Sequence, residues 1–444
     1  MTDLLPVSNW ILRGDEPVAA SSLEAGPADS FAGLRGHFAL HLPGGKDGEH
    51  VLLRDPLGVN KLFFAVGPDG GVDAANFYID LRRLGHPPAR IWSVPSGHLV
   101  RVAPARKTLS LEKVSPLAYA EDEPATQEDL IRFAGAIRAR LEGTFRALAR
   151  PLRGRKLYVT MSGGLDSTVV ATLAREFVGE FTGVTFRVDG PVPAAESQDD
   201  LYFARKVAEK LDVKLEVVTI SQKALLELVD PVLLYGQDFR DFNVHCGLVN
   251  AAIGAALRER HGAPASSSAS AADRPVVLTG DTMNELVADY TPVAYQARDY
   301  YELPNIPIGK RRRFLVMGLD SGDREVGIFA HYGVDTIQPY ALCPEVYTAL
   351  PGPLLDQEGA KQQIVRRVMG DSVPEFIYQR PKVRAQVGSS EEVGGTLAAL
   401  VDQGIDSAEL ERRFCQLMGL SPKELKSWIR AGLYRFTPAY PQES

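Results

Sequence analysis

One junction constrains the fold of this chain more than any other: a short strand-like run that enters a glycine turn and leaves it as a helix. The run is KLYVTM (156–161), the turn contains Gly163 and Gly164, and STVVATLAREF (167–177) has the apolar spacing of a helix. Three more apolar runs alternate with helical stretches, at 181–188, 214–220 and 275–281. This alternation predicts an α/β fold built from parallel βα units. The rest of the chain, to Ser444, is expected to be mostly helical.

The same junction is the strongest candidate for a binding site. In VTMSGGLDST (159–168), Gly163 and Gly164 let the backbone turn sharply and approach an anion, and Ser162 and Ser167 add hydroxyl donors next to the N–H groups of a helix start. Such a loop suits pyrophosphate. Asp166 repels phosphate and is therefore a candidate magnesium ligand. The alternative is an ordinary βα turn that uses glycine for geometry and serine for capping. The candidate nucleotide-binding residues here are Ser162, Gly163, Gly164, Leu165, Asp166 and Ser167.

The first 118 residues have a different pattern. Short apolar runs such as GHFALHL (36–42) and KLFFAVG (61–67) alternate with Gly, Pro and Asp turn signals, which predicts a β-rich unit joined by hairpins. PDGG (68–71) is one candidate turn. A charged segment, 120–130, separates this unit from the α/β region. We therefore expect two domains, 1–118 and 125–444, within the two or three that 444 residues allow.

Composition excludes several classes of function. The net charge of −7 provides no basic field for nucleic acid, and no run approaches the roughly 20 apolar residues of a membrane span. Three cysteines, Cys246, Cys343 and Cys415, are widely separated and show neither a disulfide framework nor metal-ligand spacing. We expect a cytoplasmic enzyme with small-molecule substrates, no nucleic-acid partner and no membrane partner. A homodimer stays open.

The SGGLDS motif resembles the pyrophosphate loop of the ATP pyrophosphatase superfamily, whose members adenylate a carboxylate or a similar oxygen and release pyrophosphate. The flanking sequence is similar to class B asparagine synthetases from about residue 31 onward. VLLRDPLGVNKLFF (51–64) resembles the back half of their glutaminase domain, and VVLTGDTMNEL (276–286), HYGVDTIQPY (331–340) and QRPKVRAQVGS (379–389) match the order of their synthetase domain. The RPK-x(5)-GS stretch is most similar to β-lactam and carbapenam synthetases.

The resemblance implies a fold, cofactors and a departure. It implies a β-rich remnant of an Ntn-hydrolase-like sandwich, followed by a parallel-sheet nucleotide-binding synthetase domain with extra helices, and it implies ATP and Mg²⁺. Glutamine-dependent relatives need a cysteine directly after the initiator methionine. Position 2 is Thr2 and the next twenty residues contain no cysteine. We therefore expect no glutaminase activity, and a shortened scaffold that packs against the synthetase domain.

A second departure lies in TGDTMNEL, where the family has a Ser-Gly-x-Gly-Ser-Asp type of loop. The metal-binding aspartate of the family falls on Asn284, between the candidate metal ligands Asp281 and Glu285. An amide is a neutral ligand, so the second magnesium site is weakened unless Asp281 or Glu285 takes over. Thr279 and Gly280 are candidate nucleotide-binding residues. The alternative is a plain strand end and helix cap.

The catalytic residues implied by the resemblance are a lysine and a base. Lys382, in RPK, falls where the family holds pyrophosphate and the transition state, and Lys361 resembles its other phosphate-facing lysine, one residue out of register. The catalytic tyrosine of the β-lactam synthetase-like branch falls on Asp281, so its Tyr-Glu dyad is not reproduced. Candidate replacement bases are Glu325, Asp323 and Asp335, each of which can instead be a solvated or salt-bridged acid.

Three further features have weaker functional alternatives. Asp238 and Asp241 fall where the family lines its substrate pocket, or are helix-surface acids, and KRRR (310–313) is a phosphate patch or a solvated loop. The favoured interpretation is an enzyme that adenylates a small carboxylic acid and transfers it to an amine, within one molecule or between two, in specialised-metabolite or antibiotic biosynthesis. The alternatives are a lasso-type peptide macrocyclase and a catalytically impaired ATP-binding scaffold. A tRNA-modifying pyrophosphatase is least favoured, given the net charge.

Overall fold

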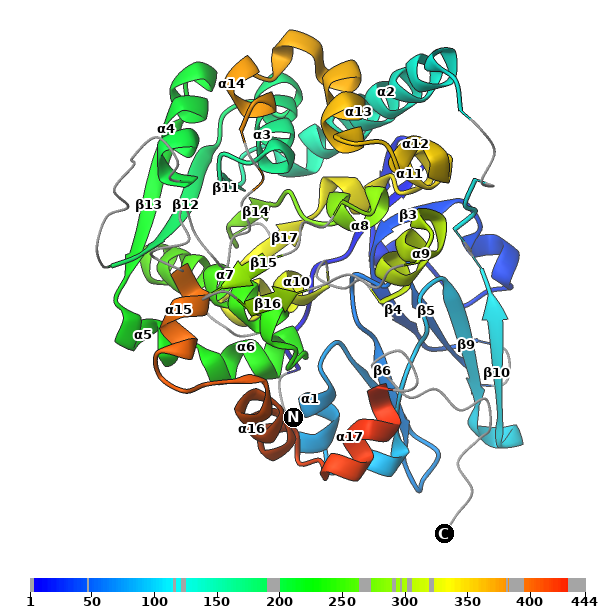
Figure 1. Cartoon of the computed structure of the whole chain (residues 1–444). Helices are drawn as coiled ribbons and strands as arrows, with labels where there is room; N and C mark the ends of the chain where they lie inside the picture. The colour runs from blue at the N-terminus through cyan, green and yellow to red at the C-terminus, as the bar shows by residue number, and fades with distance from the viewer. Residues whose placement is uncertain are drawn as a thin grey trace.

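The computed structural model describes residues 4–45, 48–114, 117–120, 125–189, 200–262, 273–289, 293–295, 298–301, 306–318, 323–380, 382 and 395–429. Figure 1 shows a β-rich part, drawn in blue and cyan, beside an α/β part that contains a parallel sheet. Both features agree with the sequence-based expectation. The small-residue stretch at 263–272 and the second half of the QRPKVRAQVGS motif, from 383, lie outside the described residues.

The β-rich part is made of three antiparallel sheets. In one, β2 (Glu16–Val18), β1 (Trp10–Arg13) and β3 (Leu34–His37) lie in that order. The second has the order β10 (Thr108–Lys113), β9 (His98–Ala103), β5 (His50–Arg54) and β4 (Ala39–Leu42), and the third β7 (Val72–Ala75), β6 (Phe63–Val66) and β8 (Ile91–Ser93). The predicted turn at 68–71 joins β6 to β7, with Gly70 at φ +83°. The β-rich expectation is therefore confirmed.

The α/β part is built on five parallel strands in the order β13, β12, β11, β14, β17. Their bounds are β11 Leu157–Thr160, β12 Thr182–Val188, β13 Lys214–Ile220, β14 Val276–Leu278 and β17 Asp335–Ile337. Val159 of β11 pairs with Gly183 on one side and Leu278 on the other. The four strands expected from the sequence are present. The fifth, β17, lies in a region expected to be mostly helical.

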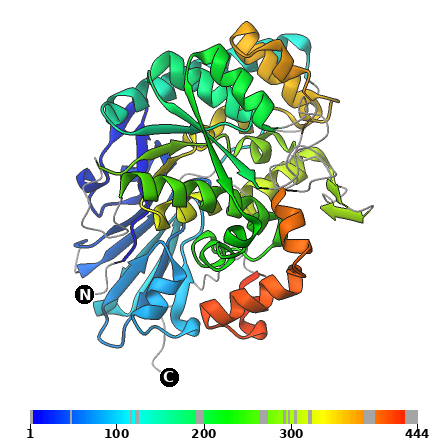
Figure 2. The same cartoon turned by 90° about the vertical axis from the view of Figure 1, so that its left-hand side faces the viewer.

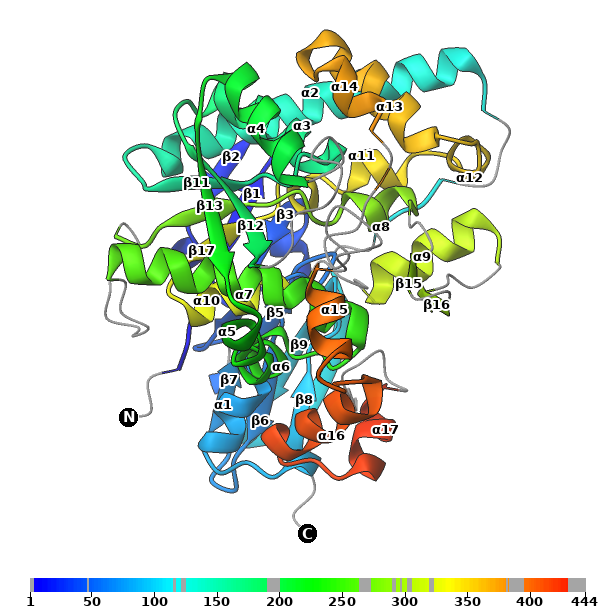
Figure 3. The same ribbon diagram turned by 60° about the vertical axis from the view of Figure 1, so that its left-hand side comes forward.

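Helices cover both faces of this sheet. Successive side chains of a strand point to opposite faces, and they therefore belong to two different apolar clusters. Leu157 and Val159 belong to the cluster that contains helices α2 (Gln127–Leu152) and α3 (Leu165–Phe177). Tyr158, between them, belongs to the cluster that contains α7 (Asp241–His261) and α10 (Arg324–His331). Figure 3 shows α2, α3 and α4 on one side of the strands and α7 and α10 on the other. The alternation confirms a buried central sheet.

The remaining elements surround this core. They are α1 (Tyr78–Arg83), α4 (Asp200–Leu211), α5 (Gln222–Leu226), α6 (Val229–Gly236), α8 (Met283–Val287), β15 (Val293–Tyr295), β16 (Arg298–Tyr301), α9 (Ile308–Gly318), α11 (Glu345–Thr348), α12 (Gly352–Leu355), α13 (Ala360–Met369), α14 (Glu375–Tyr378), α15 (Gly395–Val401), α16 (Ser407–Met418) and α17 (Pro422–Ile429). Short 3-10 turns cover Ala20–Ser22, Ala28–Phe31, Pro88–Arg90, Pro104–Arg106, Pro339–Leu342 and Gly370–Ser372. No helix in the described part of the chain is both long and apolar enough to cross a bilayer.

The two parts pack against each other. Leu57 and Val59 of the β-rich part share the apolar cluster of α2, α3 and β11. Arg35 on β3 donates from Nη1 to the carbonyl of Leu342 at 2.8 Å. Helix α16, near the end of the described chain, returns to α1 of the β-rich part, as Figure 2 shows. The expected contact between the two parts is present, and the exact domain boundary between 118 and 125 stays a prediction.

Candidate active site

The SGGLDS loop lies at the carboxyl edge of the parallel sheet. It leaves the end of β11, and α3 begins at Leu165. The stretch from Thr279 to Thr282 leaves the end of β14, which is the neighbouring strand, and leads into α8. The carboxyl edge of an open parallel sheet is where such folds bind ligands. Two of the sequence-predicted segments therefore meet at the expected edge.

Two glycines allow the backbones at this edge to approach each other. Gly163 has φ +67°, and a Cβ there would lie 2.4 Å from Phe203 Cβ and 2.7 Å from the backbone nitrogen of Ala204. A Cβ on Gly280 would lie 2.8 Å from the backbone nitrogen of Ser167 and 3.0 Å from the carbonyl carbon of Asp166. No side chain larger than hydrogen fits at either position without moving backbone.

The loop's own polar groups hold its shape. Ser162 Oγ and Ser167 Oγ lie 3.2 Å apart, the N–H of Gly164 donates to Ser162 Oγ at 3.2 Å, and Ser167 Oγ donates to the Gly164 carbonyl at 3.1 Å. Gly164 is the N-cap of α3 and provides no side-chain cap. No serine caps this helix, so the structure does not show the alternative of a serine-capped turn. The partial positive charge at the start of α3 faces the loop. Leu165 lies half-buried in the first turn of α3.

A lysine pair, Lys361 and Lys382, reaches this loop. Lys361 Nζ, at the start of α13, donates to Asp166 Oδ2 at 2.6 Å and to Asn284 Oδ1 at 2.6 Å. Lys382 Nζ donates to the same Asn284 Oδ1 at 2.9 Å and to Asp289 Oδ2 at 2.7 Å. Four residues singled out from the sequence, Asp166, Asn284, Lys361 and Lys382, thus lie together.

The charges of this cluster influence one another. Burial, followed by the neighbouring Lys361 ammonium, lowers the pKa of Lys382 to about 8. Burial alone would raise the pKa of Asp289, but the two lysines outweigh that effect and lower it. Asp289 is therefore a carboxylate at neutral pH, held between two ammonium groups.

A carboxyl pair, Asp281 and Glu325, lies on the other side of α8's start. The two side chains lie close enough for their charges to interact, and Glu325 Oε2 is buried without a hydrogen-bond partner among the described residues. Burial, and next the negative charge of Asp281, raises the pKa of Glu325 well above its usual range, whereas Arg324 opposes that shift. Gln338 donates from Nε2 to Glu325 Oε1. Glu325 is thus the protonated member. Burial also raises the pKa of Asp281.

The remaining residues of the TGDTMNEL segment are buried around the carboxyl pair. The Thr279 hydroxyl has no hydrogen-bond partner among the described residues, and Glu285, fully buried on α8, further raises the pKa of Glu325. Thr282 stands where the family pattern has glycine, and its φ is +80°. A β-branched residue in this region is strained. Its hydroxyl donates to Gln338 Oε1, and this bond together with burial holds it there.

Asp335, a predicted base, lies away from this site. It occupies the amino end of β17, paired with Val276, whereas the loop lies at the carboxyl end of the neighbouring strands. Arg155 Nη2 donates to its Oδ2 at 2.7 Å and Arg274 Nε lies 3.2 Å from its Oδ1. The structure does not bring Asp335 together with the other site residues, and it shows the salt-bridged alternative.

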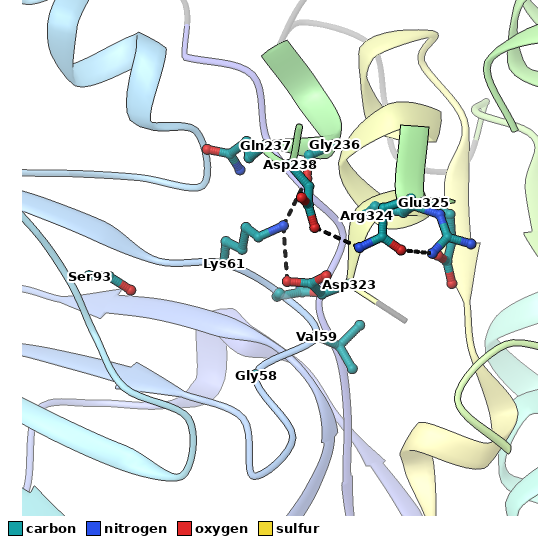
Figure 4. A network of polar contacts seen from close by, with 12 residues as sticks. Gly58, Val59, Lys61, Ser93, Gly236, Gln237, Asp238, Asp323, Arg324 and Glu325 are labelled. Carbon is teal, nitrogen blue, oxygen red and sulfur yellow. Dashed lines mark hydrogen bonds and ion pairs between the residues drawn. The ribbon is translucent and has the colours of Figure 1, made fainter. Parts of the chain in front are cut away.

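Asp323 and Asp238 belong to a buried polar network that Figure 4 shows. Asp323 Oδ2 lies 2.9 Å from Lys61 Nζ, which comes from the β-rich part, and both side chains are almost completely buried. Arg240 Nη2 lies 2.6 Å from Asp238 Oδ2, and Asn243 donates to the same oxygen at 2.6 Å. Both acids therefore have close cationic partners.

Two weaker features also have structural roles. Asp241 accepts a hydrogen bond from Ser407 Oγ at 2.6 Å. The KRRR run lies on α9, where Arg312 is buried and donates from Nη1 to the Leu350 carbonyl at 2.7 Å. Arg312 is therefore neither a phosphate contact nor part of a solvated loop.

Three residues at the site were not assigned a role from the sequence. Asp289 contacts both lysines, Arg380 Nη1 donates to the Ser162 carbonyl at 3.0 Å, and the Tyr340 hydroxyl donates to the Asp166 carbonyl at 2.9 Å. Arg380 and Tyr340 lie within the QRPK and HYGVDTIQPY motifs, which offered a signal. Asp289 lies just beyond TGDTMNEL and had none.

Asp166 is the residue of this site best suited to a metal. Among the described residues, no three His, Cys, Asp or Glu side chains gather closely enough to hold one by themselves. Asp166 Oδ1 is buried and has no hydrogen-bond partner within that same part of the chain. Magnesium that is bound mainly by phosphate oxygens and water needs only one or two carboxylates. Asp166 therefore fits a nucleotide-bound magnesium ion.

Comparison with known proteins identifies the part of the chain that holds this loop. Residues 142–319 match the asparagine synthase family. The matched stretch contains β11, β14 and the segment with Asn284 and Asp289. The resemblance inferred from the sequence is confirmed for this stretch. Its closer likeness to β-lactam synthetases stays a prediction.

Individual relatives are more distant. A stretch of 81 residues is 36% identical to the tRNA-specific 2-thiouridylase MnmA of Syntrophotalea carbinolica. The aligned stretch covers 18% of this chain and 23% of that protein. Two solved structures also align. NMN synthetase from Francisella tularensis has 14% sequence identity and a TM-score of 0.31, and the alignment covers 66% of this chain and 95% of that chain. An NH3-dependent NAD synthetase from Campylobacter jejuni has 13% identity and a TM-score of 0.28, and the alignment covers 68% of this chain and 93% of that chain. TM-scores at this level carry no structural argument.

Proposed function

We propose that this chain is an ATP-dependent amide ligase that forms AMP and pyrophosphate. The match of residues 142–319 to the asparagine synthase family supports an ATP-using ligase or amidotransferase type of activity. The observation that carries the proposal is the meeting of the SGGLDS loop with the lysine pair at the carboxyl edge of the sheet. A glycine turn, a helix start and two ammonium groups form one site for a polyphosphate.

The site residues divide the work of binding ATP. Gly163 and Gly280 let the loop pack closely against α4 and against the start of α3, and Ser162 and Ser167 offer hydroxyl groups beside the phosphates at the start of α3. Asp166 would hold magnesium, which supplies charge neutralisation between the phosphates when it is bound. The arrangement around Asp166 suits this role because one carboxylate oxygen is engaged by Lys361 and the other is not hydrogen-bonded within the described chain.

In the first step, an oxygen of a substrate carboxylate attacks the α-phosphorus of ATP. The bond from the α-phosphorus to the bridging oxygen breaks, and pyrophosphate leaves with the electron pair, so that an acyl-adenylate remains. Lys361 and Lys382 stabilise the negative charge that develops on the leaving pyrophosphate, because Lys361 contacts Asp166 of the loop and Lys382 lies beside Lys361 on the same Asn284 oxygen.

In the second step, an amine attacks the acyl carbon and AMP leaves with the carboxylate oxygen. The carboxyl pair is the proposed base. Glu325 holds its proton, and Asp281, which lies closer to solvent, takes the proton of the attacking nitrogen. Asp281 thus takes the place of the tyrosine of the β-lactam synthetase-like branch, with Glu325 as its partner.

The substrates proposed are a small carboxylic acid and an amine, in the same molecule or in two. Glutamine hydrolysis is not part of the proposal, because residues 1–245 contain no cysteine to act as its nucleophile. We further propose a role in specialised-metabolite biosynthesis, because the chain then takes its amine from another source than glutamine.

The test has two stages. Calorimetry with magnesium-ATP establishes binding, and a panel of amino acids and small carboxylic acids is then screened for acid-dependent pyrophosphate release. Asp166→Asn should abolish release, whereas Asp230→Asn, an exposed acid on α6 that pairs with Arg413 at 3.8 Å, should leave it unchanged. A wild-type protein that binds no ATP, or an Asp166→Asn protein with full release, would sink the proposal.

A further inference from the structure

Asp289 lies beside Asn284 and carries the negative charge that the asparagine at position 284 lacks. Helix α8 ends at Val287, and Ala288 follows with φ +53°. This left-handed residue reverses the chain, and the N–H of Asp289 donates to the Asn284 carbonyl at 3.0 Å. The turn therefore brings Asp289 back beside the residue that stands at the aspartate position of the family.

Asp289 and Asn284 both contact the ammonium groups of Lys361 and Lys382. Asn284 Oδ1 accepts from Lys361 at 2.6 Å and from Lys382 at 2.9 Å. Asp289 Oδ2 lies 2.7 Å from Lys382 Nζ and 3.5 Å from Lys361 Nζ. The Asp289 carbonyl accepts a further hydrogen bond from Lys382.

The amide and the carboxylate differ in charge. Asn284 satisfies lysine hydrogen bonds but does not offset two adjacent positive charges, which repel each other when they are withdrawn from water. The carboxylate of Asp289 offsets the charge of Lys382, whereas Lys361 lies closer to Asp166, at 2.6 Å. An ammonium group has three N–H donors, and Asn284 Oδ1, Asp289 Oδ2 and the Asp289 carbonyl oxygen occupy three acceptor positions around Lys382 Nζ. Phosphate can reach this nitrogen only by displacing one of them.

We propose that Asp289 is the second counter-ion of the lysine pair, beside Asp166: it carries the negative charge that the family pattern places at position 284, and it releases Lys382 to phosphate when a nucleotide binds. This inference rests on the proposed function, in which the lysine pair faces the phosphates of ATP. It makes Asp289 a positioning residue, because it acts on the reaction through Lys361 and Lys382.

Three variants of almost unchanged shape test the proposal by removing, adding or moving the negative charge at positions 289 and 284. Asp289→Asn removes the charge, Asn284→Asp adds one at the atom that already contacts both lysines, and the double variant moves the charge from one position to the other with almost no change of shape. Two quantities are measured on each full-length protein: the melting temperature, and the affinity for pyrophosphate in the presence of magnesium by calorimetry.

The two readouts should move in opposite directions. Asp289→Asn should lower the melting temperature by about 2–4 °C, because the two ammonium groups are then left with one counter-ion, Asp166. It should bind pyrophosphate about fivefold more tightly, because a competing anion is gone. The double variant should return both quantities toward wild type. Asn284→Asp alone should weaken pyrophosphate binding, which provides a separate test even if Asp289→Asn does not fold.

The control is Asp80→Asn, which removes a buried acid paired with Arg83 at 3.0 Å on α1. It should leave pyrophosphate affinity unchanged, and Asn284→Asp should not rescue its stability. A merely structural role for Asp289 would lower the melting temperature and the affinity together, and that result, or a double variant no better than Asp289→Asn, overturns the proposal. If wild-type protein binds no pyrophosphate, the proposed function fails, while rescue of the melting temperature still reports on the counter-ion role.

Discussion

Removing one partner of the ion pair between Lys61 and Asp323 should be among the most destabilising single changes at the contact between the two parts. Lys61 Nζ lies 2.9 Å from Asp323 Oδ2, and the side chains are 4% and 6% exposed. The same nitrogen donates to the Gly236 carbonyl at 2.9 Å. Figure 4 shows this lysine reaching from the β-rich part toward the start of α10.

Replacing Lys61 by methionine removes the charge but keeps most of the volume. A buried carboxylate that loses its partner costs about 3–5 kcal/mol, and the Gly236 carbonyl loses a donor that contributes about 1 kcal/mol. We therefore expect Lys61→Met to lower the free energy of unfolding by about 4 kcal/mol. Replacing both partners by apolar residues, in Lys61→Met/Asp323→Leu, should recover most of the loss, because no charge is then left buried.

Equilibrium urea unfolding of the two single variants and the double variant measures this coupling. The structure requires the double variant to be about 2 kcal/mol or more better than the sum of the singles. If the losses in unfolding free energy of the two single variants simply add, Lys61 and Asp323 are not coupled. The ion pair then does not hold the start of α10 against the β-rich part. A matched exposed pair, Arg366 and Glu375 at 2.7 Å, should give a coupling below about 1 kcal/mol.

Three other outcomes are expected at the site. Gly280→Ala should abolish pyrophosphate release, since its Cβ would lie 2.8 Å from the backbone nitrogen of Ser167; an active variant would show that this approach is not required. Pyrophosphate affinity should fall as pH rises through about 8, because the ammonium form of Lys382 binds the anion and its pKa is lowered to about 8; calorimetry between pH 7 and 9 would detect a flat profile as contrary evidence. Ala288→Gly should raise the free energy of unfolding by about 1 kcal/mol, because φ is +53° there, and urea denaturation would reveal an opposite sign.

The parts of the fold that depend on local pattern could be predicted from the sequence. Leu157, Tyr158 and Val159 form an apolar run beside a glycine turn, and this run is the central region of a parallel sheet with both faces covered. The loop after it and the lysine at 361 were also predictable, because motif and spacing carry them. Strand β17 was not, since a three-residue strand inside a polar motif has too little pattern to distinguish it from a turn.

The partners of the acids could not be predicted. Asp335 and Glu325 look alike in sequence as candidate bases, but one stands at the amino end of a strand and the other is buried beside Asp281. Asp323 has its partner in a distant part of the chain, at Lys61. Asp289 reaches the lysines only because a non-glycine residue adopts a left-handed conformation before it, which no turn signal announces.

The central claim, that a carboxylate oxygen attacks the α-phosphorus of ATP at the SGGLDS loop, can be measured directly by isotope transfer. An acid that supports pyrophosphate release is labelled with oxygen-18 in its carboxylate, and the AMP formed is examined by mass spectrometry. The account predicts one labelled oxygen in AMP, because AMP leaves the acyl-adenylate with that oxygen. Unlabelled AMP from the labelled acid, or AMP labelled only when the water is labelled, would contradict it.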